Sequence, residues 1–94
     1  MRFVWDEKKS RLNLVKHKIS FGTATLVFDD PHAVSRLDRV EGGEERWQTL
    51  GLAGGIAVLL VAYTYREDDG EEVIRIISTR KATPYERRLY EEDF

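Results

Sequence analysis

The spacing of apolar residues changes along this chain, from helical in the first third to strand-like in most of the rest. A short apolar segment, residues 2–5, predicts a first strand and is followed by Asp6, a good N-cap residue. Leu12, Val15 and Ile19 then recur at i, i+3 and i+7, with lysine and arginine between them. This spacing predicts an amphipathic helix with a strongly basic polar face.

A second helical pattern begins after Ser20, which can serve as another N-cap. Phe21, Ala24 and Phe28 again follow the i, i+3, i+7 spacing, so we expect a second, shorter helix. The Asp30-Pro31 step ends this helix, because the residue before a proline avoids the helical region of backbone space.

Paired glycines punctuate the sequence after Ala33, as in a series of hairpins. Between them, we expect strands at about 33–40, 45–52, 56–65 and 72–80. The third of these is apolar almost throughout, which is typical of a central strand covered on at least one face.

The last helix has the clearest start signal in the sequence. Thr83 is its expected N-cap, Pro84 its first residue, and Glu86 completes a Thr-x-x-Glu capping box. The element order therefore predicts an α+β fold, with two N-terminal helices and one C-terminal helix packed on an antiparallel β-sheet of four to five strands. A length of 94 residues predicts one domain, spanning residues 1–94.

Composition narrows the classes of function. The chain has no cysteine, which excludes thiol catalysis and disulfides. Its longest apolar run, residues 56–63, is far shorter than the roughly 20 residues that cross a membrane. No apolar segment follows the N-terminus as in a signal peptide, so we expect a cytoplasmic protein. The two histidines have no spacing typical of a metal site, and we expect no metal.

The net charge of −2 argues against a general affinity for nucleic acid, but the charges are unevenly distributed. Residues 1–40 carry eight cations and five acids (+3), residues 41–72 two and eight (−6), and residues 73–94 five and four (+1). A fold that joins the two ends of the chain would create a local basic surface.

Three cations lie on or beside the last predicted strand: Arg75, Arg80 and Lys81. Strict alternation places Arg75 and Arg80 on opposite faces. Arg80 and Lys81 precede a helix N-terminus, where free N–H groups and the helix dipole favour an anion, and arginine binds phosphate through two hydrogen bonds. We interpret this end of the strand as a site for RNA phosphate. The alternative, especially for Arg75, is a solvated charge that pairs with a neighbouring acid.

For the other candidate residues, a purely structural interpretation stands beside the functional one. Arg66 ends the apolar strand beside residues 72–73 and either pairs with a glutamate there or joins a phosphate clamp. Glu45 is a solvated strand residue, or a general base if it faces the arginines. Lys16 and His17 close the first helix, where cations offset the helix dipole, although histidine also suits general acid–base catalysis.

Several segments of the chain stand in a characteristic order. They are Phe3–Asp6, Asn13 with Lys16-His17, Ile19 with Phe21, Ala24 with Val27–Pro31, Glu45-Arg46, Leu50-Gly51, Leu59–Arg66, Ile74–Thr83 and Glu86-Arg87. In this order they resemble the BrnT toxins, small ribonucleases of type II toxin–antitoxin modules with a RelE-like fold. The resemblance covers nearly the whole chain. No single segment is specific, but the ordered set is.

The resemblance implies RNA cleavage that inhibits translation, with no metal or cofactor. The RNA 2′-hydroxyl would attack the adjacent phosphate, which needs a base, cations around the phosphorane and an acid near the leaving oxygen. It also implies a cognate antitoxin with a ribbon-helix-helix-type DNA-binding domain. The complex would repress its own operon, so operator DNA would be bound only through the antitoxin.

On this basis Arg66 and Arg80 would stabilise the phosphorane. Glu45 would act as the base, and His17 or Tyr90 would act as the acid. The residues assigned to catalysis are Arg66, Arg80, Glu45, His17 and Tyr90. Those assigned to RNA binding are Lys9, Lys16, Lys81, Arg75 and Trp5. For Trp5 and Tyr90, the alternative is packing in the core. A competing hypothesis for the whole chain is a non-catalytic binding module of the same fold that acts only in the repressing complex.

Overall fold

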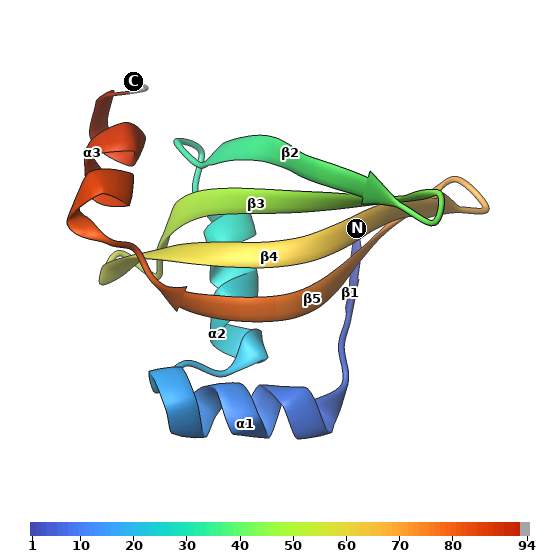
Figure 1. Cartoon of the computed structure of the whole chain (residues 1–94), viewed down its shortest axis with the longest axis horizontal. Helices are drawn as coiled ribbons and strands as arrows, with labels where there is room; N and C mark the ends of the chain where they lie inside the picture. Colours follow the sequence, from blue (N-terminus) through green and yellow to red (C-terminus); the bar gives the residue numbers. More distant parts are fainter. Residues whose placement is uncertain (93–94) are drawn as a thin grey trace.

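A twisted five-stranded sheet forms the centre of the protein, with helices on both sides (Figure 1). The computed structural model describes residues 1–92. Its elements are β1 (Arg2–Val4), α1 (Glu7–His17), α2 (Phe21–Ala24), the 3-10 helix η1 (Thr25–Asp29), β2 (Val34–Glu41), β3 (Glu44–Ala53), β4 (Ala57–Asp68), β5 (Glu71–Lys81) and α3 (Pro84–Glu92). The predicted α+β fold, with two N-terminal helices and one C-terminal helix, is confirmed.

The sheet has the order β1-β5-β4-β3-β2, so the apolar strand β4 is central, as its sequence predicts. Strands β2 to β5 form an antiparallel meander. The prediction of a purely antiparallel sheet is wrong in one respect, because β1 pairs with β5 in parallel. The sheet is therefore mixed, and its parallel strand comes from the opposite end of the chain.

The helix starts are the predicted ones. The Asp6 carboxylate accepts hydrogen bonds from the backbone of Lys8 and Lys9, and the Ser20 hydroxyl accepts one from the backbone N–H of Thr23. These bonds satisfy N–H groups that a helix start leaves without an intrahelical partner. They fix where the chain turns from β1 into α1 and from α1 into α2.

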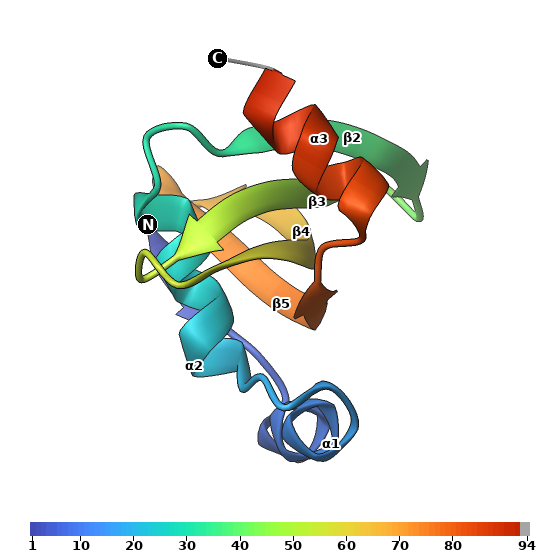
Figure 2. The same cartoon turned by 90° about the vertical axis from the view of Figure 1, so that its left-hand side faces the viewer.

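One face of the sheet packs against α2 and η1, and the main core lies there, while α1 lies along the β5 edge (Figures 1 and 2). Phe21, Ala24 and Val27 are almost fully buried against this face. Opposite them, the sheet contributes Val61 from β4 and Ile76 from β5. We call this side of the sheet the helical face.

Helix α1 does not bury the apolar residues whose spacing predicted it. Leu12 and Val15 are 64% and 72% exposed, whereas Ser10 and Asn13 are buried. The Asn13 amide donates to the carbonyls of Ile19 and Thr79 at 2.8 and 2.9 Å and accepts from the Thr79 N–H at 3.3 Å. β1 pairs only with residues 73–75 of β5. Farther along β5, the Asn13 amide bonds to the backbone N–H and C=O of Thr79, which a neighbouring strand would otherwise pair. The predicted inward apolar stripe is therefore wrong.

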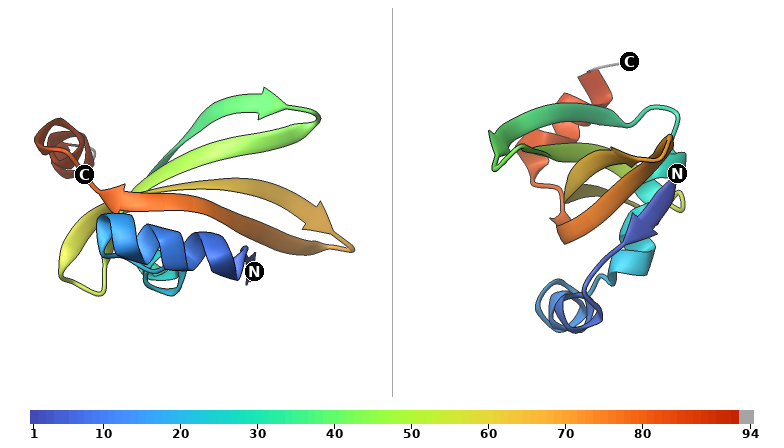
Figure 3. Two further views of the ribbon diagram at one scale, coloured as in Figure 1. Left: turned by 60° about the horizontal axis from the view of Figure 1, so that its bottom comes forward. Right: turned by 90° about the vertical axis from the view of Figure 1, so that its right-hand side faces the viewer.

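Helix α3 crosses one end of the opposite sheet face (Figure 3). Tyr90 packs there against Leu50 and Leu60, and its hydroxyl donates to Asp30 Oδ2 at 2.6 Å. The same carboxylate oxygen accepts the backbone N–H of Leu52 at 2.7 Å. Asp30 thus ties α3 to the sheet. No helix in the described part of the chain is long and apolar enough to cross a membrane.

Candidate functional site

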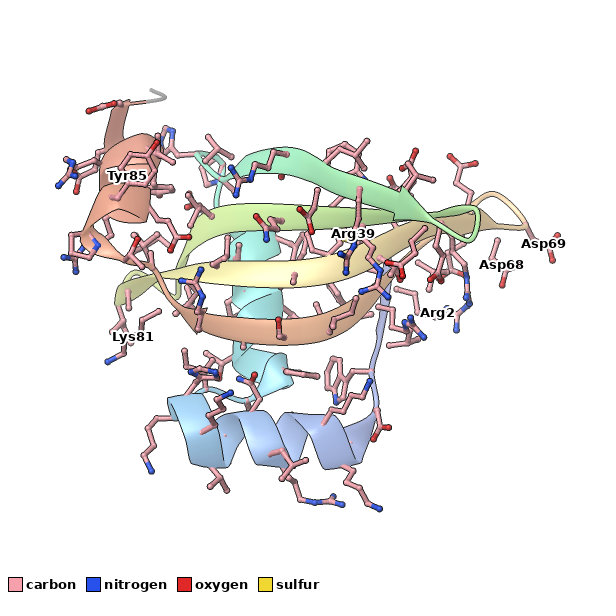
Figure 4. The ribbon with its side chains drawn as sticks, viewed as in Figure 1. Arg2, Arg39, Asp68, Asp69, Lys81 and Tyr85 are labelled. Carbon is pink, nitrogen blue, oxygen red and sulfur yellow. The ribbon has the colours of Figure 1, made fainter. Side chains whose placement is uncertain are left out.

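The sheet face opposite α2 and η1 is covered by α3 at one end only, and the rest is lined with arginine side chains. We call it the arginine face. In Figure 4, the side chain of Arg39 lies across the sheet on this side. By strand register, the arginines on this face of strands β2 to β5 are Arg36, Arg39, Arg46, Arg66, Arg75 and Arg80.

Two β-bulges bring these arginines to the same face. In β5 the pairing with β4 passes from Ser78 directly to Ile76, so Ile77 is an extra residue. Arg75 and Arg80, five positions apart, therefore point to the same side of the sheet. The prediction that alternation separates them is wrong, because it assumes a regular strand. Bulges are frequent beside functional sites, where they redirect side chains.

A similar irregularity occurs in β2, where the pairing with β3 jumps from Leu37 to Arg39. The extra residue is Asp38. It places Arg36 and Arg39 on one face although they are three positions apart. The arginine face thus depends on two insertions in the ladder, one in an edge strand and one beside the central strand.

Three of the arginines form a single row across the sheet. Arg39 of β2 pairs with Arg46 of β3, Arg46 with Thr64 of β4, and Thr64 with Arg75 of β5. We call Arg39, Arg46 and Arg75 the arginine row. Like charges directly opposite each other on neighbouring strands destabilise a sheet. A row of this kind is therefore costly for the fold and favourable for binding an anion.

Two acids of the β2–β3 hairpin offset part of this charge. Glu41 Oε2 lies 3.1 Å from Arg39 Nε and 3.3 Å from Arg46 Nε. Glu44 Oε1 lies 3.7 Å from Arg75 Nη2. The Nε atom of Arg46 is buried and has no well-aligned hydrogen-bond acceptor among the described residues. Two acids face three arginines, so the row keeps a net positive charge.

Arg80 is committed to the start of α3. Its Nη1 and Nη2 atoms donate to the two carboxylate oxygens of Glu86 at 2.7 and 3.0 Å. Glu86 Oε1 also accepts the N–H of Thr83, completing the predicted capping box. The hydrogen bond from Arg80 is the largest of the effects that lower the pKa of Glu86 from 4.5 to about 2. Arg80 therefore holds an internal carboxylate where we predicted a phosphate.

Arg66 and Arg80 do not form a clamp. Arg66 pairs with Val73, as predicted, while Arg80 pairs with Leu60. Residues 60 and 66 are six positions apart on β4, which corresponds to about 20 Å along a strand. Arg66 is exposed and makes no hydrogen bond or ion pair with the described residues. The predicted clamp between these two arginines is wrong.

Glu45 lies on the helical face, because it pairs with Tyr65 and follows Glu44 by one position. Its Oε1 atom accepts the indole N–H of Trp47 at 3.1 Å, at the rim of a cleft of about 270 Å³. The sheet separates this carboxylate from the arginine row. The predicted grouping of Glu45 with the arginines in one cleft is therefore wrong.

The remaining predicted residues also lie away from the row. Lys9, Lys16 and His17 belong to α1, and Lys81 shares the helical face with its partner Leu59. Trp5 is half-buried, with its ring edge-on to Phe21 and its indole N–H donating to Glu7. The structure thus brings none of these side chains to the arginine row.

Tyr90 is buried on the arginine-face side, beneath α3. The hydrogen bond to Asp30 is the largest effect that raises the pKa of its phenol, to about 12. Burial is the largest single effect and raises the pKa of Asp30, but the hydrogen bonds from Leu52, Tyr90 and His32 and the charge of His32 together lower this pKa overall. Tyr90 therefore packs in the fold, in agreement with the alternative of core packing.

Arg36, Arg39 and Arg46 are site residues that the sequence pattern does not predict. Each sits in an ordinary-looking alternating strand, and a bulge is not visible in that pattern. The only available signal was the like-charged pair that the hairpin register places at Arg39 and Arg46. In chemical terms, the row offers several fixed N–H donors to an anion with multiple oxygens. Within residues 1–92, no three acidic or histidine side chains are grouped so as to hold a metal ion.

Comparisons with known proteins agree with this architecture. A family model described as the ribonuclease toxin BrnT of type II toxin–antitoxin systems matches residues 5–86. No curated protein sequence matches the chain. Among solved structures, the crystal structure of the ribonuclease toxin BrnT from Brucella abortus is similar with a TM-score of 0.61 and 21% sequence identity. The similarity covers 88% of this chain and 97% of that chain, and at this identity it supports the fold.

Proposed function

This chain belongs to the BrnT family of ribonuclease toxins of type II toxin–antitoxin systems, and we propose that it cleaves RNA on its arginine face. The reaction is attack of an RNA 2′-hydroxyl on the adjacent phosphate. A bond forms between the 2′-oxygen and phosphorus, and the bond from phosphorus to the 5′-oxygen breaks. The products are a 2′,3′-cyclic phosphate and a 5′-hydroxyl end, and no metal ion takes part.

The arginine row is the observation that carries this proposal. The pentacoordinate phosphorane has more negative charge on its oxygens than the starting phosphate, and fixed donors aimed at this charge lower the barrier. Arg46 and Arg75 lie on either side of Thr64, about 10 Å apart at the backbone from the usual strand spacing. Their long side chains can therefore converge on one phosphate, with Arg39 beside Arg46.

Glu44 replaces Glu45 as the proposed base. It lies on the arginine face, its side chain is 37% exposed, and its contact with Arg75 is long at 3.7 Å. It can therefore take the proton of a 2′-hydroxyl bound at the row. Glu41 is less suited to this role, because its oxygen is shared between Arg39 and Arg46 at 3.1 and 3.3 Å. The leaving 5′-oxygen takes its proton from water in this scheme.

Neighbouring residues on opposite faces allow a matched test of the base. We expect Glu44→Gln to slow RNA cleavage by at least about a hundredfold, the typical contribution of a general base. Glu45→Gln makes the same change one position away, on the helical face, and should leave the rate within about twofold. Equal loss in both variants, or loss only in Glu45→Gln, would remove Glu44 from the mechanism.

The cations can be tested in the same assay. Arg39→Ala should reduce cleavage by about tenfold or more, because the row loses one donor to the phosphorane. Arg11→Ala removes the same side chain from the exposed side of α1 and serves as the control. A loss in Arg11→Ala that matched the loss in Arg39→Ala would indicate a general charge effect and contradict a local site.

A type II toxin has a cognate antitoxin, and we propose that here it carries a ribbon-helix-helix-type DNA-binding domain. It would block RNA cleavage in the cytoplasm, and the complex would bind operator DNA through the antitoxin alone. Expression of this chain by itself should arrest growth, and co-expression of the antitoxin should restore it. Operator binding by the purified toxin without antitoxin would contradict this arrangement.

A non-catalytic binding module is the second candidate. It is favoured by the positions of Glu45 and His17, which lie away from the row, and by the ion pairs that hold Glu41 and Glu86. Under this hypothesis the row binds a partner's acidic surface and cleaves nothing. Growth arrest on expression without antitoxin, lost in Glu44→Gln, would exclude it.

A further inference from the structure

A cleft lies between α3 and the sheet, at the covered end of the arginine face. Its volume is about 450 Å³, within the range of roughly 300–1,000 Å³ typical of small-molecule sites. Leu50 and Leu60 form an apolar floor, and Leu89 of α3 contributes a wall. Arg36, Gln48 and Glu92 supply polar groups. A flat, mostly apolar ligand with polar edges would fit these surroundings.

The cleft is next to the arginine row. Gln48 and Arg36 pair directly across β3 and β2, and Gln48 lies two positions beyond Arg46 on the same face. Two positions correspond to about 7 Å along a strand. This separation lies within the span of one nucleotide. A phosphate held at the row can therefore place a neighbouring base in the cleft.

The polar groups select among bases. Arg36 donates from Nε and Nη2 to Gln48 Oε1 at 3.1 and 2.9 Å, which occupies the acceptor capacity of that amide oxygen. Gln48 therefore offers its NH₂ group, and Arg36 its remaining N–H groups, as donors. Donors of this kind match the O6 and N7 acceptors of guanine. Adenine has an N6 amino group that needs an acceptor there, so it fits less well.

Glu92 supplies the complementary acceptor from the end of α3. Its carboxylate can accept the N–H groups on the Watson–Crick edge of guanine. Glu86 also lines the cleft, but it cannot accept these N–H groups readily, because both of its oxygens are bound by Arg80. Donors on the strand side and the Glu92 carboxylate, which has no hydrogen-bond or ion-pair partner within residues 1–92, together define the recognition.

We propose that this cleft binds a guanine base of the RNA substrate and thereby fixes the position of the cut. The inference rests on the proposed ribonuclease function and extends it to sequence preference. Cleavage by the purified toxin should occur at a constant position relative to a guanine. The base would stack against Leu89 and the apolar floor, with its polar edges between Arg36 and Glu92.

Binding of mononucleotides tests the cleft without requiring cleavage. In calorimetric titrations of the toxin freed of antitoxin, GMP should bind at least about tenfold more tightly than AMP. Glu92→Gln should remove most of this preference while leaving AMP binding unchanged. Glu91→Gln, an exposed neighbour that does not line the cleft, is the matched control and should keep the preference.

Mapping of cut sites in total RNA separates this inference from the proposed function. Wild-type cuts should cluster at guanine, and Glu92→Gln should cut with a reduced guanine preference. Cleavage without any guanine preference, together with equal GMP and AMP binding, would overturn the guanine cleft and leave the ribonuclease intact. Selective GMP binding without RNA cleavage would support the cleft and refute the ribonuclease. Protection of the cleft by the antitoxin with no GMP binding would assign it to a protein partner and overturn the inference.

Discussion

Protonation of Glu86 is expected to weaken the fold by a predictable amount. Its carboxylate joins Arg80 of β5 to Thr83 at the start of α3. The hydrogen bond from Arg80 is the largest effect lowering its pKa from 4.5 to about 2. The difference corresponds to roughly 3 kcal/mol at 1.36 kcal/mol per pKa unit. The Arg80 side chain is 39% exposed, so solvent screening reduces this to about 2 kcal/mol.

The sign follows from the direction of the shift. A carboxylate with a lowered pKa in the folded state stabilises the fold at pH values above its unfolded pKa of 4.5. This contribution is lost as the pH falls from about 4.5 to about 2. Stability that depends on Glu86 should therefore be constant near neutral pH and disappear in acid.

Urea unfolding monitored by tryptophan fluorescence between pH 7 and pH 2.5 tests this expectation. At pH 7, Glu86→Gln should be about 2 kcal/mol less stable than the wild type, and the difference should fall to about 0.5 kcal/mol at pH 2.5, just above the folded pKa. Contributions of other carboxylates cancel in the comparison. Glu91→Gln, on the same helix and exposed, should differ little from the wild type at any pH. A Glu86→Gln difference that stays constant with pH would refute the reasoning.

Three further predictions concern the fold. Asn13→Ala should lower the free energy of unfolding by about 3 kcal/mol in urea titrations, because three hydrogen bonds, two of them to Thr79, are lost at roughly 1 kcal/mol each; a loss below about 1 kcal/mol would contradict this role. Gly51→Ala should cost about 1–3 kcal/mol, since the new Cβ would lie 2.5 Å from Val27 Cγ1; unchanged thermal stability would contradict the tight packing. In a spectrophotometric pH titration, Tyr90 should ionise near pH 12, and this late component should be missing from Tyr90→Phe; a wild-type titration with no component near pH 12 would show that its hydrogen bond is absent.

Local signals predicted most of the fold. Asp6, Ser20 and Thr83 were identified as helix starts because capping depends on the residue itself and its nearest neighbours. The paired glycines marked the strand ends for the same reason, since Gly42 and Gly43 adopt φ values of +58° and +78°. These features require no knowledge of distant parts of the chain.

Features that depend on distant partners were missed. The parallel partner of β1 is distant in the sequence, since Arg2 pairs with Val73, 71 positions away. The inward face of α1 is polar because Asn13 bonds to the exposed edge of β5, and this partner is 66 positions away. An apolar spacing at Leu12 and Val15 could not reveal that edge.

The candidate site was predicted in its chemistry more than in its geometry. Arginine was expected to line the site, and Arg75 does belong to the row. Arg80 precedes a helix N-terminus, and this position predicts a phosphate, but it does not reveal that both carboxylate oxygens of Glu86 bind the arginine. The bulge at Ile77 and the ion pair to Glu86 both arise from tertiary packing. Neither could be predicted from spacing along the strand.

The most direct test of the central proposal is the rate of RNA cleavage by the purified toxin, freed of antitoxin, with and without EDTA. Wild-type protein should cleave at the same rate in both conditions, and Arg75→Ala should be slower by about tenfold or more. Arg11→Ala should cleave like the wild type. Cleavage that stops in EDTA, or an Arg75→Ala protein with full activity, would contradict a metal-free ribonuclease that acts through the arginine row.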